Sequence, residues 1–210
     1  MNRHEDIMVP PVLNGLILCG GKSHRMQEDK SLLKYRGIPH WQYICDLLDP
    51  IVDDTWISCR KDQAGQFETG TKLLFDRKDI HAAGPAGGLL AAWNRFPDRA
   101  WLVVACDLPL VTAQSLTGLV NSRDPKSPAT AFLNREKNWP EPLLAIWEPA
   151  GLQILAANAE MDRYCPRKTL EQCQASLVPF PNSEELFNAN TPEDREQARR
   201  SLAHRPSPHR

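Results

Sequence analysis

The sequence lacks an excess of charge of either sign and a long apolar run. Its 210 residues carry 25 Lys and Arg against 26 Asp and Glu, a formal net charge of −1. Bulk binders of nucleic acid or anionic membranes carry a basic excess, so this balance argues against both functions. No apolar run approaches the roughly 20 residues of a membrane span, and the first residues lack the basic-then-apolar order of a secretory signal. The sequence therefore predicts a cytoplasmic globular protein with no nucleic-acid or membrane partner.

The sequence also lacks a cysteine or histidine pattern that would indicate zinc or a disulfide framework. Its six cysteines include no CxxC pair, and its six histidines are scattered. Structural zinc sites bring such ligands together at short spacings, which are missing here. Cys19 and Cys106 lie inside apolar runs, where a free cysteine behaves as a small buried hydrophobic residue. We therefore expect reduced, structural thiols.

The order of apolar segments predicts one α/β domain. Strands are expected at 12–19, 55–59, 72–75, 101–105, 129–133 and 143–147, and helices at 41–49, 86–96, 112–121, 150–159 and about 191–200. Alternation of helices with strands that are apolar throughout is typical of a mostly parallel sheet covered on both faces. The fold class is thus a single three-layer α/β/α domain with a Rossmann-like sheet. It would span residues 12–201, between polar tails at 1–11 and 202–210 that we predict to be disordered.

In such folds ligands bind at the carboxyl ends of the strands, and the first strand ends in a loop suited to phosphate. Gly20 and Gly21 would let backbone N–H groups approach an anion closely. Arg25 and Lys30 add cations that could neutralise a triphosphate. A Walker A loop is excluded because Leu16 stands where its first glycine would be. The alternative is an ordinary strand-to-helix turn with solvated charges.

Two aspartates stand at the ends of later strands. The expected 101–105 strand is followed by Cys106 and then by Asp107. A carboxylate at the end of such a strand is a natural Mg²⁺ ligand when phosphates supply further oxygens. The alternative is a turn or cap aspartate, since Pro109 follows. Asp76 ends the 72–75 strand and could accept hydrogen bonds from the edge of a base, or could be a turn residue.

Two further segments could approach a ligand. Gly84 opens the glycine-rich entry to the 86–96 helix, GPAGG, for which the alternative is a tight bend. Asn188 and Asn190 alternate on an extended segment, so both side chains could face one side. The run TPED that follows Asn190 resembles a capping box with proline in the first helical turn. Asn190 or the threonine after it would then be the cap of that helix.

Taken together, these segments resemble a known family. LCGGKSHRMQEDKSLL is similar to the signature L-x-G-G-x-S-x-R-M-G-x-D-K-x-L-L of the nucleotidyltransferase-like family that includes molybdenum cofactor guanylyltransferases. GPAGG, VVACDLP and FNANTPED are similar to the family blocks G-P-L-A-G, C-D-x-P and N-x-N-T-P-E-D. The blocks occur in the family's order and cover nearly the whole expected domain. The resemblance also implies the sheet of the nucleotide-diphospho-sugar transferase type.

The resemblance implies transfer of GMP from GTP to the terminal phosphate of molybdopterin, with Mg²⁺ as cofactor and pyrophosphate as the second product. Residues of about 12–110 would bind the nucleotide and those of about 111–201 the acceptor. Transient contact with cofactor-inserting or cofactor-receiving proteins is a further expectation. Carried over by motif, the catalytic residues are Arg25, Lys30 and Asp107; the nucleotide-binding residues are Leu18, Cys19, Gly20, Gly21, Lys30, Asp76, Gly84 and Asp107; the metal ligand is Asp107; and the acceptor-binding residues are Asn188, Asn190 and, as a basic surface candidate, Lys168.

The sequence departs from the family signature inside the phosphate loop. Gln27 replaces the family's glycine, and Glu28 adds a negative charge close to where phosphate would lie. If position 27 needs a positive φ, glutamine would cost on the order of 1–2 kcal/mol. Two alternatives therefore stay open: a cytidylyltransferase acting on the same or another phosphorylated acceptor, and a nucleotide-binding protein that has lost turnover.

Overall fold

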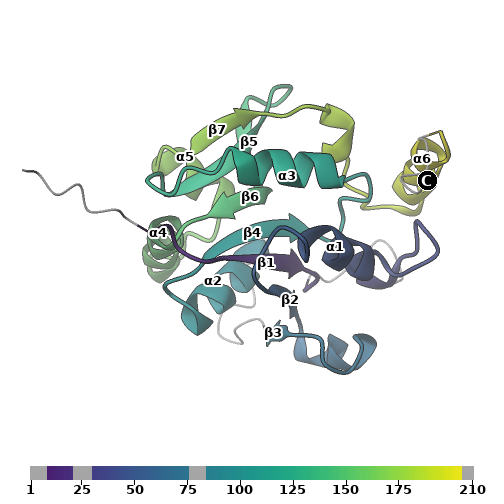
Figure 1. Cartoon of the computed structure of the whole chain (residues 1–210), viewed down its shortest axis with the longest axis horizontal. Helices are drawn as coiled ribbons and strands as arrows, with labels where there is room; N and C mark the ends of the chain where they lie inside the picture. Colours follow the sequence, from purple (N-terminus) through teal and green to yellow (C-terminus); the bar gives the residue numbers. More distant parts are fainter. Residues whose placement is uncertain (1–8, 21–29, 76–83, 205–210) are drawn as a thin grey trace, which may run out of the picture.

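The computed structural model describes residues 9–20, 30–75 and 84–204. Within them, seven strands form one sheet in the order β3-β2-β1-β4-β6-β5-β7 (Figure 1). The strands are β1 (Leu13–Leu18), β2 (Thr55–Cys59), β3 (Leu73–Phe75), β4 (Ala100–Ala105), β5 (Ala129–Asn134), β6 (Trp139–Trp147) and β7 (Ser176–Pro179). Only β6, among these seven, runs against its neighbours; the other pairs are parallel. The expected mostly parallel sheet is confirmed.

Helices cover both faces of the sheet. They are α1 (His40–Leu48), α2 (Pro85–Arg95), α3 (Ala113–Asn121), α4 (Pro149–Glu160), α5 (Pro166–Gln172) and α6 (Pro192–Ala203), with short 3₁₀ turns η1 (Lys30–Leu32), η2 (Lys61–Gln66) and η4 (Ser183–Leu186). The apolar side chains of α1 and α3 pack on one face, and those of α2, α4 and α5 on the other. The expected three-layer α/β/α arrangement is therefore confirmed. No helix within the described ranges is long and apolar enough to cross a membrane.

The central strands are apolar throughout because both of their faces are covered. In β4, Leu102 and Val104 enter the cluster under α1 and α3, whereas Trp101 and Val103 enter the cluster under α2 and α4. All six residues of β4 are buried. Successive side chains of a strand point to opposite faces, so a strand between two helical layers needs apolar residues at every position.

The structure contains elements that apolar periodicity did not predict. α5 is only seven residues long and β7 only four, too short for a clear period. β6 begins at Trp139 and not near Leu143 as expected. Its early residues include Pro140 and Pro142, which cannot donate to a strand ladder and argue against a strand in the sequence alone. The last helix runs to Ala203, three residues beyond its expected end.

Gly151 offers a test of how tightly α4 packs on the sheet. A Cβ added there would lie 2.2 Å from the carbonyl oxygen of Pro128. We expect Gly151→Ala to lower the free energy of unfolding by about 1–3 kcal/mol, because backbone must move to admit the methyl group. Gly118→Ala on α3 is the matched control, since its Cβ would meet nothing within 4 Å; that change should be neutral or stabilising. Urea unfolding measures both, and equal stabilities would contradict the close contact.

Candidate active site

Three segments that are far apart in sequence meet at the carboxyl edge of the sheet. β1 and β4 are neighbours with Leu18 beside Ala105, so the loops that follow them start side by side. The backbone N–H of Ala189 donates to the carbonyl of Asp107 at 2.9 Å, which brings in the segment before α6. Figure 1 shows α6 at the edge toward which the β1 and β4 arrows point. This is the edge at which the sequence predicts ligand binding.

The side chain of Lys30, which follows the β1 loop, contacts both of the other segments, one at Asp107 and one at Asn190. Its Nζ donates to Asn190 Oδ1 at 2.5 Å and lies 3.7 Å from Asp107 Oδ2. The side chains of Lys30 and Asp107 are 21% and 23% exposed, so both remain accessible to a ligand. The structure thus brings together a cation, a carboxylate and an amide that the sequence assigned to one site.

Asp107 lies in a setting that disfavours its negative charge. Burial raises the pKa of its carboxyl above the ordinary value, although the nearby Lys30 acts in the opposite direction. Its Oδ1 is buried and has no hydrogen-bond partner among the described residues. A buried carboxylate oxygen without a partner at a ligand-binding edge fits a hard cation such as Mg²⁺, which prefers oxygen ligands.

The described residues alone would hold such a cation weakly. Within residues 9–20, 30–75 and 84–204, no group of three or more His, Cys, Asp or Glu side chains could hold a metal. Mg²⁺ characteristically combines one or two carboxylates with substrate phosphates and water. Asp107 therefore fits the metal only if a phosphorylated ligand completes the coordination.

Asp194 fixes the backbone that carries Asn190. Its Oδ2 accepts hydrogen bonds from the N–H groups of Asn190 and Thr191, each at 2.9 Å. Its own N–H donates to Thr191 Oγ1 at 3.2 Å, which completes the predicted capping box. Burial acts to raise the pKa of Asp194, but these hydrogen bonds outweigh it and lower that pKa. Thr191 is thus the cap of α6, and Asn190 is left to bond Lys30.

Two residues that sequence reasoning missed hold the end of β1. Gln63 Nε2 donates to the carbonyl of Cys19 and Arg60 Nη1 donates to that of Gly20, both at 3.2 Å. Since N–H and C=O point in opposite directions across a trans peptide, the N–H of Gly20 points away from η2. Arg60 directly follows β2, so the strand-end rule that singled out Asp107 could also have singled out Arg60.

The glycine-rich entry of α2 approaches the sheet closely. Gly84 is the N-cap with φ of +52°, a conformation that glycine adopts without strain. A Cβ at Gly88 would lie 2.5 Å from both Leu18 Cδ2 and Ser58 Oγ. Gly88 therefore permits close packing of the helix on the ends of β1 and β2, and the approach of a ligand at Gly84 stays a prediction.

A cavity of about 510 Å³ adjoins Asn190. It lies between the β5–β6 hairpin, η4 and the segment before α6. Its lining combines aromatic, amide and charged side chains. The lining residues are Leu133, Asn134, Arg135, Glu136, Lys137, Phe180, Ser183, Glu184, Leu186, Phe187, Asn188 and Asn190.

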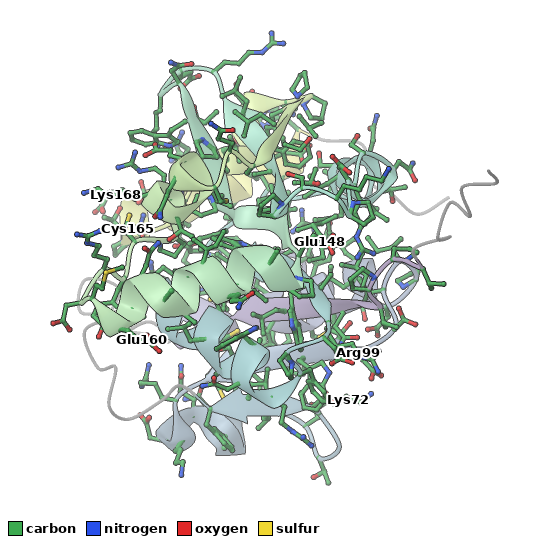
Figure 2. The ribbon with its side chains drawn as sticks, turned by 90° about the vertical axis from the view of Figure 1, so that its left-hand side faces the viewer. Lys72, Arg99, Glu148, Glu160, Cys165 and Lys168 are labelled. Atoms are coloured by element: carbon green, nitrogen blue, oxygen red, sulfur yellow. The ribbon has the colours of Figure 1, made fainter. Side chains whose placement is uncertain are left out.

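The remaining candidate residues lie elsewhere. Lys168 is on α5, which packs against α4 and β6. Figure 1 shows α5 at the opposite end of the molecule from α6, and Figure 2 labels Lys168 on that side. Lys168 is therefore not brought to Asn190. Gly21, Arg25 and Asp76, like the divergent Gln27 and Glu28, are outside the described residues.

Comparisons with known proteins agree on one family. The profile described as "MobA-like NTP transferase domain" matches residues 15–176. The chain is 34% identical over 183 residues to a molybdenum cofactor biosynthesis bifunctional protein of Synechocystis, covering 87% of this chain but only 52% of that protein. It is 30% identical over 184 residues to a molybdenum cofactor guanylyltransferase of Pseudomonas syringae pv. syringae, covering 87% and 90% of the two chains.

The same fold occurs in a solved structure. Molybdopterin-guanine dinucleotide biosynthesis protein A of Archaeoglobus fulgidus superposes with a TM-score of 0.72. The match covers 91% of this chain and all of that one, at 20% sequence identity. At that identity the likeness supports the fold, and the family rests on the sequence matches.

Proposed function

Because the chain belongs to the family of MobA-like NTP transferase domains and is a nucleotidyltransferase, we propose that it transfers GMP from GTP to the terminal phosphate of molybdopterin. The products would be the guanine dinucleotide cofactor and pyrophosphate. Relatives named as molybdenum cofactor guanylyltransferases support this choice of substrates. The observation that carries the proposal is the meeting of Lys30, Asp107 and Asn190 at one edge of the sheet.

The proposed reaction needs charge neutralisation more than proton transfer. An oxygen of the acceptor phosphate forms a bond to the α-phosphorus of GTP, and the bond from that phosphorus to the pyrophosphate oxygen breaks. The acceptor oxygen is already anionic, so no general base is required. Lys30, oriented by its hydrogen bond to Asn190, would stabilise the negative charge that moves onto the leaving pyrophosphate. Positioning of the two phosphates supplies the rest.

Asp107 would serve as the ligand of Mg²⁺, with phosphate oxygens completing the coordination. The bound ion would neutralise phosphate charge and polarise the phosphoryl group that is attacked. The fixed Gly20 peptide would turn its N–H toward the nucleotide side of the loop. The loop that contains Arg25 would surround the triphosphate, and Asp76 would contact the guanine.

The cavity beside Asn190 is the proposed acceptor site. It adjoins the Lys30–Asp107 pair through Asn190, which both lines the cavity and bonds Lys30. Its wall carries two cations, Arg135 and Lys137, beside the carboxylates of Glu136 and Glu184, and the two cations would bind the terminal phosphate of the acceptor. Asn188 contributes from the same segment, whereas Lys168 has no part in this site.

The cellular setting we propose is the cytoplasm. The six cysteines are thiols that are not joined in disulfides, which suits a reducing compartment. Proteins that insert the metal or receive the finished cofactor would be transient partners, and no residue here is assigned to their docking.

Calorimetric titration with each of the four nucleoside triphosphates, with and without Mg²⁺, tests the proposal. We expect selective binding of GTP that strengthens when Mg²⁺ is present, because the described residues around Asp107 offer too few ligands to hold the ion without phosphate oxygens. A preference for CTP would replace the guanylyltransferase by a cytidylyltransferase with the same mechanism. Absence of binding by all four would contradict both the enzyme and the nucleotide-binding protein that has lost turnover.

A further inference from the structure

The loop that follows Asp107 is hydrogen-bonded to side chains of α1 and of the turn that precedes α1. This loop, Leu108–Val111, follows the carboxylate immediately in sequence. Three side chains of the 36–43 segment donate to three of its backbone carbonyls. They are His40 to Leu108 at 3.1 Å, Arg36 to Pro109 at 3.0 Å and Tyr43 to Val111 at 3.4 Å.

His40 is the most buried member of this set, with 1% of its surface exposed. A carbonyl oxygen can only accept, so Nε2 of His40 carries the proton in this hydrogen bond. The ring lies against Tyr43 in a stacked arrangement, with centroids 5.8 Å apart, and meets the edge of Tyr35 at 5.3 Å. Burial lowers the pKa of His40 to about 4, so the ring is neutral near pH 7 and its tautomer is fixed.

Arg36 and Tyr43 reinforce each other. The guanidinium of Arg36 lies 3.8 Å from the centre of the Tyr43 ring, a cation–π contact that restrains both side chains. The loop's own backbone bonds are long: the N–H of Leu108 donates to Ala105 at 3.3 Å, and that of Val111 to Leu108 at 3.4 Å. Its shape therefore depends on the side chains that contact it.

The other end of the loop is also restrained. Glu185 of η4, which is buried, accepts from the N–H of Thr112 at 3.1 Å and from its hydroxyl at 3.0 Å. On the other side of the loop, the carbonyl of Asp107 accepts from Ala189. Asp107 thus stands on a backbone with restraints on both sides: the N–H of Ala189 bonds its own carbonyl, and the side chain of His40 bonds the carbonyl of the next residue, Leu108.

We propose that His40 is a positioning residue, which fixes the Leu108–Val111 loop and thereby sets the Asp107 carboxylate against Lys30. The inference rests on the proposed role of Asp107. His40 itself would touch neither nucleotide nor acceptor. Because small displacements of a metal ligand's supporting groups lower metal affinity and activity about 10–100-fold, loss of its hydrogen bond should act on the metal-dependent part of the reaction.

The test compares His40→Leu, which removes the donor, with His40→Gln, whose amide can restore an N–H close to the position of Nε2. Binding of Mn²⁺ in the presence of GTP is measured by calorimetry, beside kcat and KM. We expect His40→Leu to lose about 10–100-fold in Mn²⁺ affinity and kcat. GTP binding without metal should stay within about threefold of the unsubstituted protein. His40→Gln should recover most of the loss.

Trp41→Leu is the control for a merely structural effect. Trp41 neighbours His40 on α1 and is 5% exposed, but it packs edge-to-face on Phe67. This variant should lose stability and, while folded, keep its Mn²⁺ affinity and kcat. Equal losses in Trp41→Leu and His40→Leu, or an unimpaired His40→Leu, would overturn the positioning role and leave the proposed function standing. Absence of Mn²⁺ binding with GTP in the unsubstituted protein would overturn the role of Asp107 and the positioning inference with it.

Discussion

Replacing Asp107 by asparagine is expected to reduce turnover by about 10²–10³-fold or more, the cost of losing one preorganised electrostatic group, while the protein becomes more stable. The carboxylate is partly buried, and its pKa is raised by that burial. A raised pKa means that the fold disfavours the ionised form, so stability falls as pH rises through that pKa. Asparagine has nearly the same shape without the charge. The substitution therefore separates two effects of the carboxylate: its contribution to turnover and its destabilisation of the fold.

Two measurements check this expectation at pH 7. Release of pyrophosphate from GTP and acceptor gives turnover, and thermal unfolding gives the midpoint, which should rise by about 2–4 °C for each kcal/mol gained. Asp54→Asn is the control: Asp54 forms a surface ion pair with Lys72, and exposed pairs contribute about 0–1 kcal/mol. Full turnover in Asp107→Asn would disprove the metal assignment. A lowered midpoint would show that the carboxylate stabilises the fold.

Replacing Arg123 by methionine is expected to lower the free energy of unfolding by about 3–5 kcal/mol. Nε and Nη2 of Arg123 donate to the two carboxylate oxygens of Glu148 at 2.7 and 3.0 Å, and Nη2 also donates to the carbonyl of Pro11 at 2.8 Å. The two side chains are only 12% and 2% exposed. Without Arg123, the carboxylate of Glu148 is left buried with its charge uncompensated.

A second variant shows whether that uncompensated charge is the cause. Combining Arg123→Met with Glu148→Leu removes both charges, and replacing a buried pair by apolar residues is often neutral or stabilising. We expect the double variant to recover most of the loss in urea unfolding. Arg200→Met, which breaks an exposed pair with Glu196 on α6, should change stability by less than about 1 kcal/mol. If the double variant is as unstable as Arg123→Met, the lost hydrogen bond to the Pro11 carbonyl accounts for the loss, because methionine keeps most of the apolar stem.

Local patterns in the sequence were sufficient for most strands of the sheet, although not for β7 or the start of β6, and for the strand-end position of Asp107. The strand at Thr55–Cys59 has the predicted bounds, because its residues are apolar or β-prone and turn residues flank them. The strand-end position of Asp107 needed only the apolar run before it. The cap of α6 followed from four adjacent residues, Thr191 to Asp194, whose hydrogen bonds are those of the predicted box.

Contacts between distant residues could not be predicted in the same way. The hydrogen bond from Lys30 to Asn190 joins residues 160 positions apart, and only the folded sheet brings them together. The roles of Gln63 and His40 depend on side chains that reach carbonyls of other segments, for which sequence spacing gives no signal. Lys168 was chosen for its charge alone, and charge does not indicate which edge of the sheet a helix reaches.

The large separation in sequence between Lys30 and Asn190 determines when the site can form during synthesis. β1 to β4 lie within residues 13–105, so the parallel half of the sheet leaves the ribosome well before Asn190. Synthesis delivers the amino-terminal residues first, and closing the loop of 160 positions between Lys30 and Asn190 costs entropy that other contacts must offset. A nascent chain that has released only these four strands therefore holds Lys30 without the amide that orients it. Nucleotide transfer becomes possible only after residue 190 has emerged and joined the edge that the first hundred residues built.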